Sequence, residues 1–348
     1  MSRTTALFLA AMLGCTSFAT LDARADDGVA KGDTSAKKIA FSNSYAGNSF
    51  RQVMIKSFEE MGAKAVADKQ VAATAVVSSN NSVTEQASQI ENLILQGYDA
   101  IIVLAGSDTA LNGAIKDACN AGITVVAFAS GVTEPCAYVV DYNLDSYAKA
   151  ELDFISSKLG DKPANILEIR GMAGDGFDKR LHEGVEKAMK AHASYKAVGE
   201  VYGQWTATVA QKEVSGILPS LPQVDAVLTQ GGDGYGAAQA FKAANRPLPI
   251  IIMGNRQDEL QWWKEQKDKD GYQTWSASIA PGVSSLAFWV AQQVLDGRTD
   301  IPHDLLVPYL AFTQDDFEAE LPKIPKGGVA SHEYTQEDAI AAIKANIK

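Results

Sequence analysis

The chain has 348 residues, 46% of them hydrophobic, and a formal net charge of −11 at pH 7. A globular chain of this length exceeds what one hydrophobic core usually holds, so we expect two domains of roughly 100 to 200 residues each. The acidic balance argues against nucleic acid and anionic lipid surfaces as partners, because like charges repel.

Residues 1–25 are predicted to be an export signal that is cleaved. Arg3 gives a basic start, an apolar run extends from Ala6 to Leu13, and Ala23–Ala25 has the small-x-small pattern of a cleavage site. Lipoprotein processing at Cys15 stays open as an alternative. Beyond this segment no apolar stretch approaches the roughly 20 residues that span a bilayer, so we expect an exported protein without direct membrane insertion.

From Lys38 onward, short β-branched runs alternate with amphipathic stretches, and a hydrophobic period of two gives way each time to a period of 3.6. The first series predicts strands at 38–44, 71–79, 98–106, 123–130 and 137–143, and helices at 50–66, 84–97 and 111–122. Repeated units of this kind build a parallel sheet with helices on both faces. The predicted fold class is therefore α/β with a doubly wound sheet.

The alternation then restarts and predicts a second sheet of the same kind. Its expected strands are 164–171, 196–203, 224–232, 248–255 and 272–280, and the expected helices are 146–160, 177–192, 207–221, 236–245, 257–268 and 284–297. No low-complexity linker separates the two series, which favours several short backbone crossings and a hinge. We assign 38–141 plus 282–307 to an N-terminal lobe, and 142–281 plus 308–348 to a C-terminal lobe.

The chain beyond Pro302 is less periodic. Residues 304–312 predict a last strand. Thr335 is the expected start of a terminal helix, because Glu337 and Asp338 place acidic groups in its first turn.

After removal of the signal, the cysteines that remain are Cys119 and Cys136. In an oxidising compartment they can form a disulfide, and two buried free thiols are the alternative that the sequence leaves open. The four histidines are scattered without the spacing of metal ligands, so we expect no metal site.

Motifs that would indicate an enzyme are incomplete. Residues 232–237 read G-x-G-x-x-A after an expected strand, as in a dinucleotide turn, but the next strand ends at Gly254 and Asn255 without the acidic residue that holds a ribose. The glycine-rich turn at 171–176 lacks the Gly-Lys-Ser/Thr ending of a phosphate loop. We therefore expect a non-enzymatic protein with no catalytic residue and no cofactor.

Several segments together resemble one known family. They are KIAFSNSYAGNSFRQVMIKSFEEMGAKA, SQIENLILQGYDAIIVLAGSDTALNGAIKDACNAGITVVAF, NILEIRGMAG, GQWTATVAQ and VDAVLTQGGDGYGAAQAFKAA, in this order. The chain from about Lys38 to Gly297 resembles the type I periplasmic sugar-binding proteins of ABC transporters, in the ribose-binding-like branch. The resemblance implies two doubly wound parallel-sheet lobes joined by a multi-crossing hinge.

The resemblance also implies which residues bind the ligand. The family places a hydroxyl-binding amide at Asn48, a ring that stacks on the sugar at Phe50, and an opposing aromatic ring at Trp205. Facing rings suit a ligand with apolar C–H faces and a polar edge.

Charged and polar positions of the family map less directly. Its arginine at a helix start falls in the segment of Asp178, Lys179 and Arg180, with Lys179 in the strict alignment. Its ligand-binding aspartate is Asn255 here, and Arg256 follows it.

Three of the family's polar anchors are missing from this chain. Ala129 and Ser130 stand for an Asp-Arg pair, Gly231 for an asparagine, and Pro281 for a hinge glutamine. These departures predict a different or smaller ligand than ribose, a polyol or a sugar acid. The candidate replacements for the missing anchors are Asp141, Tyr142, Asp233 and Ser278.

The function that the resemblance implies is the solute-binding component of an ABC importer. Such a protein captures a small carbohydrate or polyol between its lobes, closes by a hinge motion, and delivers the ligand to a membrane permease. We expect a monomer. A receptor for a signal molecule on the same fold and an exported α/β enzyme stay open as alternatives.

Overall fold

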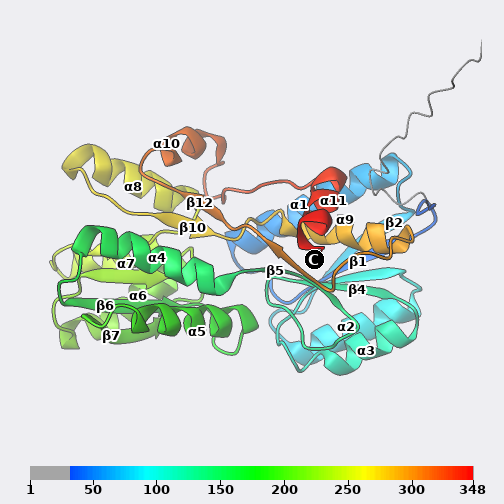
Figure 1. Ribbon diagram of the computed structural model, residues 1–348, viewed down its shortest axis with the longest axis horizontal. Coiled ribbons are helices and arrows are strands. Elements are labelled where there is room, and N and C mark those ends of the chain that lie inside the picture. Colours follow the sequence, from blue (N-terminus) through cyan, green and yellow to red (C-terminus); the bar gives the residue numbers. More distant parts are fainter. Residues whose placement is uncertain (1–31, 348) are drawn as a thin grey trace, which may run out of the picture.

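The computed structural model describes residues 32–347, so the predicted export signal at 1–25 lies outside the described residues. The described chain forms two lobes side by side, each with a parallel sheet between layers of helices (Figure 1). The predicted two-lobed, doubly wound α/β fold is confirmed. None of the helices within 32–347 is both long enough and apolar enough to cross a bilayer.

The first lobe contains a six-stranded sheet in the order β11-β5-β4-β3-β1-β2, with every neighbouring pair parallel. Its strands are β1 (Lys38–Asn43), β2 (Ala73–Ser78), β3 (Ala100–Leu104), β4 (Thr124–Phe128), β5 (Tyr138–Tyr142) and β11 (Asp304–Val307). Its helices are α1 (Ser49–Ala67), α2 (Val83–Leu95), α3 (Asn112–Asn120), α9 (Val283–Leu295) and α11 (Gln336–Asn346).

The second lobe contains a four-stranded parallel sheet in the order β7-β6-β8-β9, which an antiparallel pair, β10 and β12, extends through a bridge between Met253 and Ser276. Its strands are β6 (Ala164–Arg170), β7 (Tyr195–Tyr202), β8 (Ala226–Thr229), β9 (Ile250–Ile251), β10 (Ser276–Ser278) and β12 (Leu310–Phe312). Its helices are α4 (Leu144–Leu159), α5 (Gly176–Lys190), α6 (Ala207–Ile217), η1 (Leu218–Ser220), α7 (Gly234–Ala243), α8 (Gln257–Asp270), α10 (Phe317–Glu320) and η2 (Leu321–Lys323).

Apolar strands explain why each sheet is covered on both faces. All five residues of β3 are buried, as expected for a central parallel strand. On one face of the first sheet α1 and α9 pack through Phe58 and Phe288, and Phe41 of β1 contacts Phe58 and Phe128. On the other face α2 and α3 cover the sheet with residues such as Ile90.

The backbone passes between the lobes at four places. Three lie close together, from β5 to α4, from β10 to α9, and from β11 to β12. The fourth leads from η2, which packs on α8, to α11 in the first lobe. The single strand predicted at 304–312 is therefore wrong, because Pro308 has no N–H to continue a ladder and the chain changes lobes there.

The terminal helix also departs from the predicted lobe boundary, which assigned all of 308–348 to the second lobe. Thr335 caps α11 as predicted, but α11 packs against α9 and β11 of the first lobe. Its buried residues Ala339 and Ile343 belong to the core that α9 shares, and Asn346 accepts a bond from the Leu306 N–H at 2.9 Å.

A disulfide joins Cys119 at the end of α3 to Cys136 just before β5, with Cα atoms 6.4 Å apart. The first of the two alternatives for these cysteines is thus confirmed. The bond anchors the end of the segment that leads from β4 to β5.

Candidate functional site

A cavity lies between the lobes, where the carboxyl ends of the strands of both sheets meet. The space among its lining atoms is about 590 Å³, part of it open to solvent. The predicted site residues that line it are Asn48, Phe50, Ser130, Trp205, Gly231, Asn255, Arg256 and Ser278.

The first wall of the cavity is the start of α1. Asn48 caps this helix, because its side-chain oxygen accepts a hydrogen bond from the Arg51 N–H at 2.9 Å. The cap leaves the amide NH₂ of Asn48 as the group that can donate to a ligand. Phe50, two residues along, places a partly buried ring in the same wall.

Trp205 forms the facing wall in the second lobe. Its backbone and that of Gln204 both have positive φ, +51° and +56°, a conformation that L-residues rarely adopt. A side chain on Gly171 would collide with the indole ring, so the glycine makes room for it. The ring of Phe177 meets Trp205 edge to face, with centroids 6.4 Å apart.

Arg256 connects the two lobes beside this ring. Its guanidinium donates to the hydroxyl of Ser49 in the first lobe and, at 2.7 Å, to the carbonyl of Trp205. Behind it the buried Glu259 accepts bonds from the N–H groups of Gly234 and Gly254, at 2.9 and 3.0 Å. Burial raises the pKa of Glu259, and the positive charge of Arg256 opposes that rise.

Two other lining residues, Asn255 and Ser278, differ in whether their hydrogen-bonding groups are free to bind a ligand. The amide of Asn255 donates to the Leu310 carbonyl and accepts from Ser276, so it mainly fixes its own loop. The hydroxyl of Ser278 is buried and has no hydrogen-bond partner among the described residues. Ser278 is therefore a candidate for direct contact with a ligand hydroxyl.

Five predicted site residues lie outside the cavity lining: Tyr142, Asp178, Lys179, Arg180 and Asp233. Lys179 is exposed to solvent on α5. Asp178 is paired with Arg170 at 2.7 Å, and Asp233 accepts the Thr206 N–H at 2.9 Å, which fixes the loop that carries Trp205. Tyr142 is buried at the first crossing between the lobes.

Arg180 and Asp141, two of the predicted ligand contacts, bind each other across the cleft. Arg180, on α5, forms an ion pair with Asp141 on β5 and donates to the Ala129 carbonyl at 2.6 Å. Asp141 and Ala129 both lie in the first lobe, while the Nε of Arg180 donates to the Gly176 carbonyl of its own helix at 3.3 Å. The sequence could not show this pairing, because both residues read as candidate ligand contacts on their own.

The lining residues that sequence reasoning missed include Arg51, Phe177 and Gln230. Arg51 reads as one of the polar residues of an amphipathic helix, yet its side chain is only 7% exposed. Burial lowers its pKa to about 10, and the nearby Asp175 carboxylate opposes that fall. A usable signal existed, since a cation in the first turn of a helix opposes the helix dipole.

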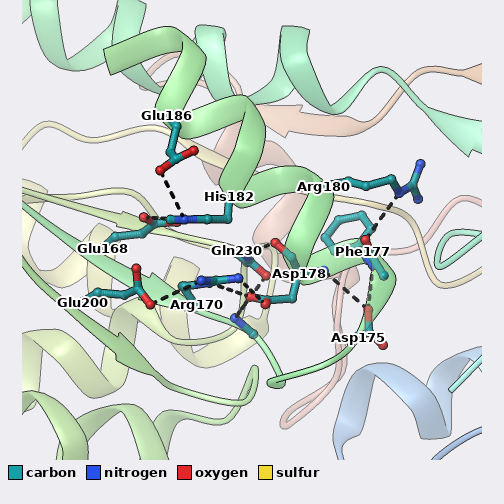
Figure 2. A network of polar contacts seen from close by, with 12 residues as sticks. Glu168, Arg170, Asp175, Phe177, Asp178, Arg180, His182, Glu186, Glu200 and Gln230 are labelled. Carbon is teal, nitrogen blue, oxygen red and sulfur yellow. Dashed lines mark hydrogen bonds and ion pairs between the residues drawn. The ribbon is translucent and has the colours of Figure 1, made fainter. Parts of the chain in front are cut away.

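A polar network extends over α5 and the adjoining strands and reaches the cavity lining at Phe177 and Gln230 (Figure 2). Ligand atoms of Glu168, His182 and Glu200 lie within 4.8 Å of one another, a grouping that could hold a metal ion. However, His182 is bonded to the Glu168 carboxylate at 2.9 Å, and Glu200 is paired with Arg170 at 3.2 Å. We interpret the network as an internal set of ion pairs that stiffens α5.

Comparison with known proteins agrees with the two-lobed fold. The model of the periplasmic binding protein domain family matches residues 39–299. A solved ABC transporter solute binding protein from Thermobispora bispora DSM 43833 superposes with a TM-score of 0.82 at 34% identity, over 89% of this chain and 95% of that one.

Two relatives with assigned ligands are also similar. The xylitol-binding protein of Mycolicibacterium smegmatis is 30% identical over 187 residues, which span only 53% of this chain and 53% of that protein. The ribose import binding protein of Haemophilus influenzae is 26% identical over 255 residues, 71% of this chain and 84% of the relative.

Proposed function

Because the chain belongs to the periplasmic binding protein domain family, we propose that it is the solute-binding component of an ABC importer. It captures a small polyhydroxylated ligand, a sugar or polyol, in the cavity between its lobes and delivers it to a membrane permease. The observation that carries this proposal is the cavity itself, whose walls hold Phe50 of one lobe and Trp205 of the other.

The chemistry of these walls suits a small sugar or polyol. Aromatic faces contact the C–H groups of such a ligand, while Asn48 and Ser278 offer polar groups to its hydroxyls. The relatives named for xylitol and ribose support the same ligand class.

Ligand binding drives closure in this proposal. Contacts from both lobes exist together only when the cleft is closed, so a ligand that makes them shifts the population toward the closed state. The permease then recognises the closed arrangement. A periplasmic location after cleavage at residue 25, and a monomeric state, complete the proposal.

Replacement of the facing rings tests the assignment. Trp205→Ala and Phe50→Ala should each weaken binding by about 1 to 3 kcal/mol, because each removes one stacking face. Isothermal calorimetry with xylitol, ribitol and ribose measures the change, and thermal unfolding checks that both variants fold.

Tyr98→Ala is the matched control, because this half-buried ring lies just before β3, at the end of the sheet away from the cavity. Unchanged affinity in both ring variants would remove these residues from the site. Conversion of any of these ligands into a product would favour the alternative of an exported enzyme.

A further inference from the structure

Arg51 is a buried cation that has no counter-ion in contact with it. Its side chain is 7% exposed, lines the cavity from the first lobe, and has a buried Nη1 without a hydrogen-bond partner among the described residues. It is the third residue of α1, where the partial positive charge of the helix N-terminus makes a cation unfavourable. A guanidinium buried this way is costly unless a ligand accepts its hydrogen bonds.

The charge that balances Arg51 comes from the opposite lobe. Asp175 caps α5 and is 7% exposed; one of its oxygens accepts the Phe177 N–H at 2.7 Å and the Asp178 N–H at 3.4 Å. Its other oxygen has only a long contact, 3.5 Å, with the hydroxyl of Ser130. In Figure 2 the carboxylate of Asp175 lies at the edge of the network nearest the blue ribbon of the first lobe.

Asp175 lies behind the cavity surface, while its neighbours Ser130 and Phe177 are in the lining. Arg51 and Asp175 form no ion pair within 4 Å. Even so, the charge of Asp175 opposes the fall that burial causes in the pKa of Arg51. The charge of Arg51 likewise opposes the rise that burial causes in the pKa of Asp175. Arg256 has the same arrangement, since the buried Glu259 balances it from behind. Each of these two arginines of the cavity thus has a buried acid outside the lining whose charge interacts with it.

We propose that Arg51 is a ligand-binding residue that donates to hydroxyl oxygens, and that Asp175 balances its charge so that the site selects neutral polyols or sugars over the corresponding sugar acids. This inference rests on the proposed function and specifies the ligand class of the same site. A carboxylate on the ligand would add a second negative charge beside Arg51, and like charges brought together in a desolvated site disfavour binding strongly.

Calorimetry with three matched pairs tests the selectivity: erythritol and erythronate, xylitol and xylonate, ribose and ribonate. In the wild-type protein the neutral member that binds best should bind at least about tenfold more tightly than its acid. Arg51→Met should weaken that neutral ligand at least about tenfold, because its hydroxyl oxygens lose a charged donor.

Asp175→Asn is the decisive variant. Asparagine caps a helix as well as aspartate does, so α5 should remain intact while Arg51 loses its balancing charge. The affinity ratio of acid to neutral ligand should then rise at least about tenfold. Asp145→Asn, which removes an exposed carboxylate from the first turn of α4, should leave the ratio unchanged.

The results separate this inference from the proposed function. A wild-type protein that binds an acid as tightly as its neutral partner, or an Asp175→Asn variant that weakens both members equally, would overturn the selectivity while the solute-binding function stands. If neither neutral nor acidic members bind the wild-type protein, both proposals fail.

Discussion

Three of the residues with a strained backbone lie at the cavity. Ala129, Gln204 and Trp205 have positive φ, and all three positions adjoin or line the cavity. Such conformations cost of order 1–3 kcal/mol each and persist only where surrounding contacts fix them. At Trp205 those contacts are the bond from Arg256 to its carbonyl and the space left by Gly171.

Glu151 on α4 destabilises the fold for a different reason, because its carboxyl group is buried. Both of its carboxylate oxygens are buried without a hydrogen-bond partner among the described residues. Burial, and secondly the charge of Glu168, raise the pKa of Glu151 well above its usual 4.5. The carboxyl group of Glu151 therefore loses its proton at a lower pH in the unfolded chain than in the folded protein. As a result, the contribution of this group to the free energy of unfolding falls as the pH rises above about 4.5.

We predict that Glu151→Gln removes this loss of stability. Near pH 4.5 the variant and the wild-type protein should unfold at similar urea concentrations. Above that pH the variant should become more stable by up to about 1.4 kcal/mol per pH unit, until the folded wild-type protein itself ionises. Urea unfolding at pH 4.5, 6 and 8 measures the difference, with Glu183→Gln on the exposed face of α5 as the control. Parallel profiles for wild type and Glu151→Gln would contradict the prediction.

Elements were predictable where one hydrophobic period extends over a whole segment. The helix expected at 257–268 is α8, and the strand expected at 98–106 contains β3, because their burial follows local periodicity. The segment 304–312 was not predictable in this way, since both β11 and β12 are apolar and only the tertiary structure places them in different sheets. The lobe of α11 likewise depends on packing with α9, which is distant in sequence.

The disulfide is expected to stabilise the elements that it joins. Cys119 and Cys136 are 17 residues apart, and closure of a loop of about that length stabilises a fold by roughly 3 kcal/mol. The double replacement Cys119→Ser and Cys136→Ser should lower the free energy of unfolding by about that amount in urea. Dithiothreitol should produce the same loss in the wild-type protein and none in the variant. If the oxidised wild-type protein, the reduced wild-type protein and the double variant are equally stable, the bond contributes nothing to stability.

At the scale of the whole molecule, the structure has the two lobes in contact across the cleft. Arg180 bonds to Asp141 and Arg256 to Ser49, so an arginine of the second lobe meets an acceptor of the first lobe in both cases. Sequence reasoning named both arginines and Asp141 as candidate ligand contacts and did not predict that these residues join the lobes. It could not do otherwise, because the distance between the lobes is not encoded by local pattern.

Asp141→Asn is predicted to favour the open form. The variant loses the charge that holds Arg180, while the bond from Arg180 to the Ala129 carbonyl can remain. Because Arg180 is about one-third exposed, solvent screens the pair, and we expect a ligand affinity only about three- to tenfold weaker. Small-angle scattering without ligand should give a larger radius of gyration than for the wild-type protein, and a saturating ligand should remove that difference.

Lys187→Gln provides the matched control for this variant. Lys187 lies on the same helix as Arg180 and pairs with Asp145, but both partners belong to the second lobe. Its loss removes an ion pair without any contact across the cleft, so neither the scattering curve nor the affinity should change. If the two variants behave alike, Arg180 and Asp141 contribute no more to closure than an ordinary surface pair. If only Asp141→Asn opens the protein, closure is stabilised by contacts between the lobes as well as by the ligand, and these contacts help to set the affinity.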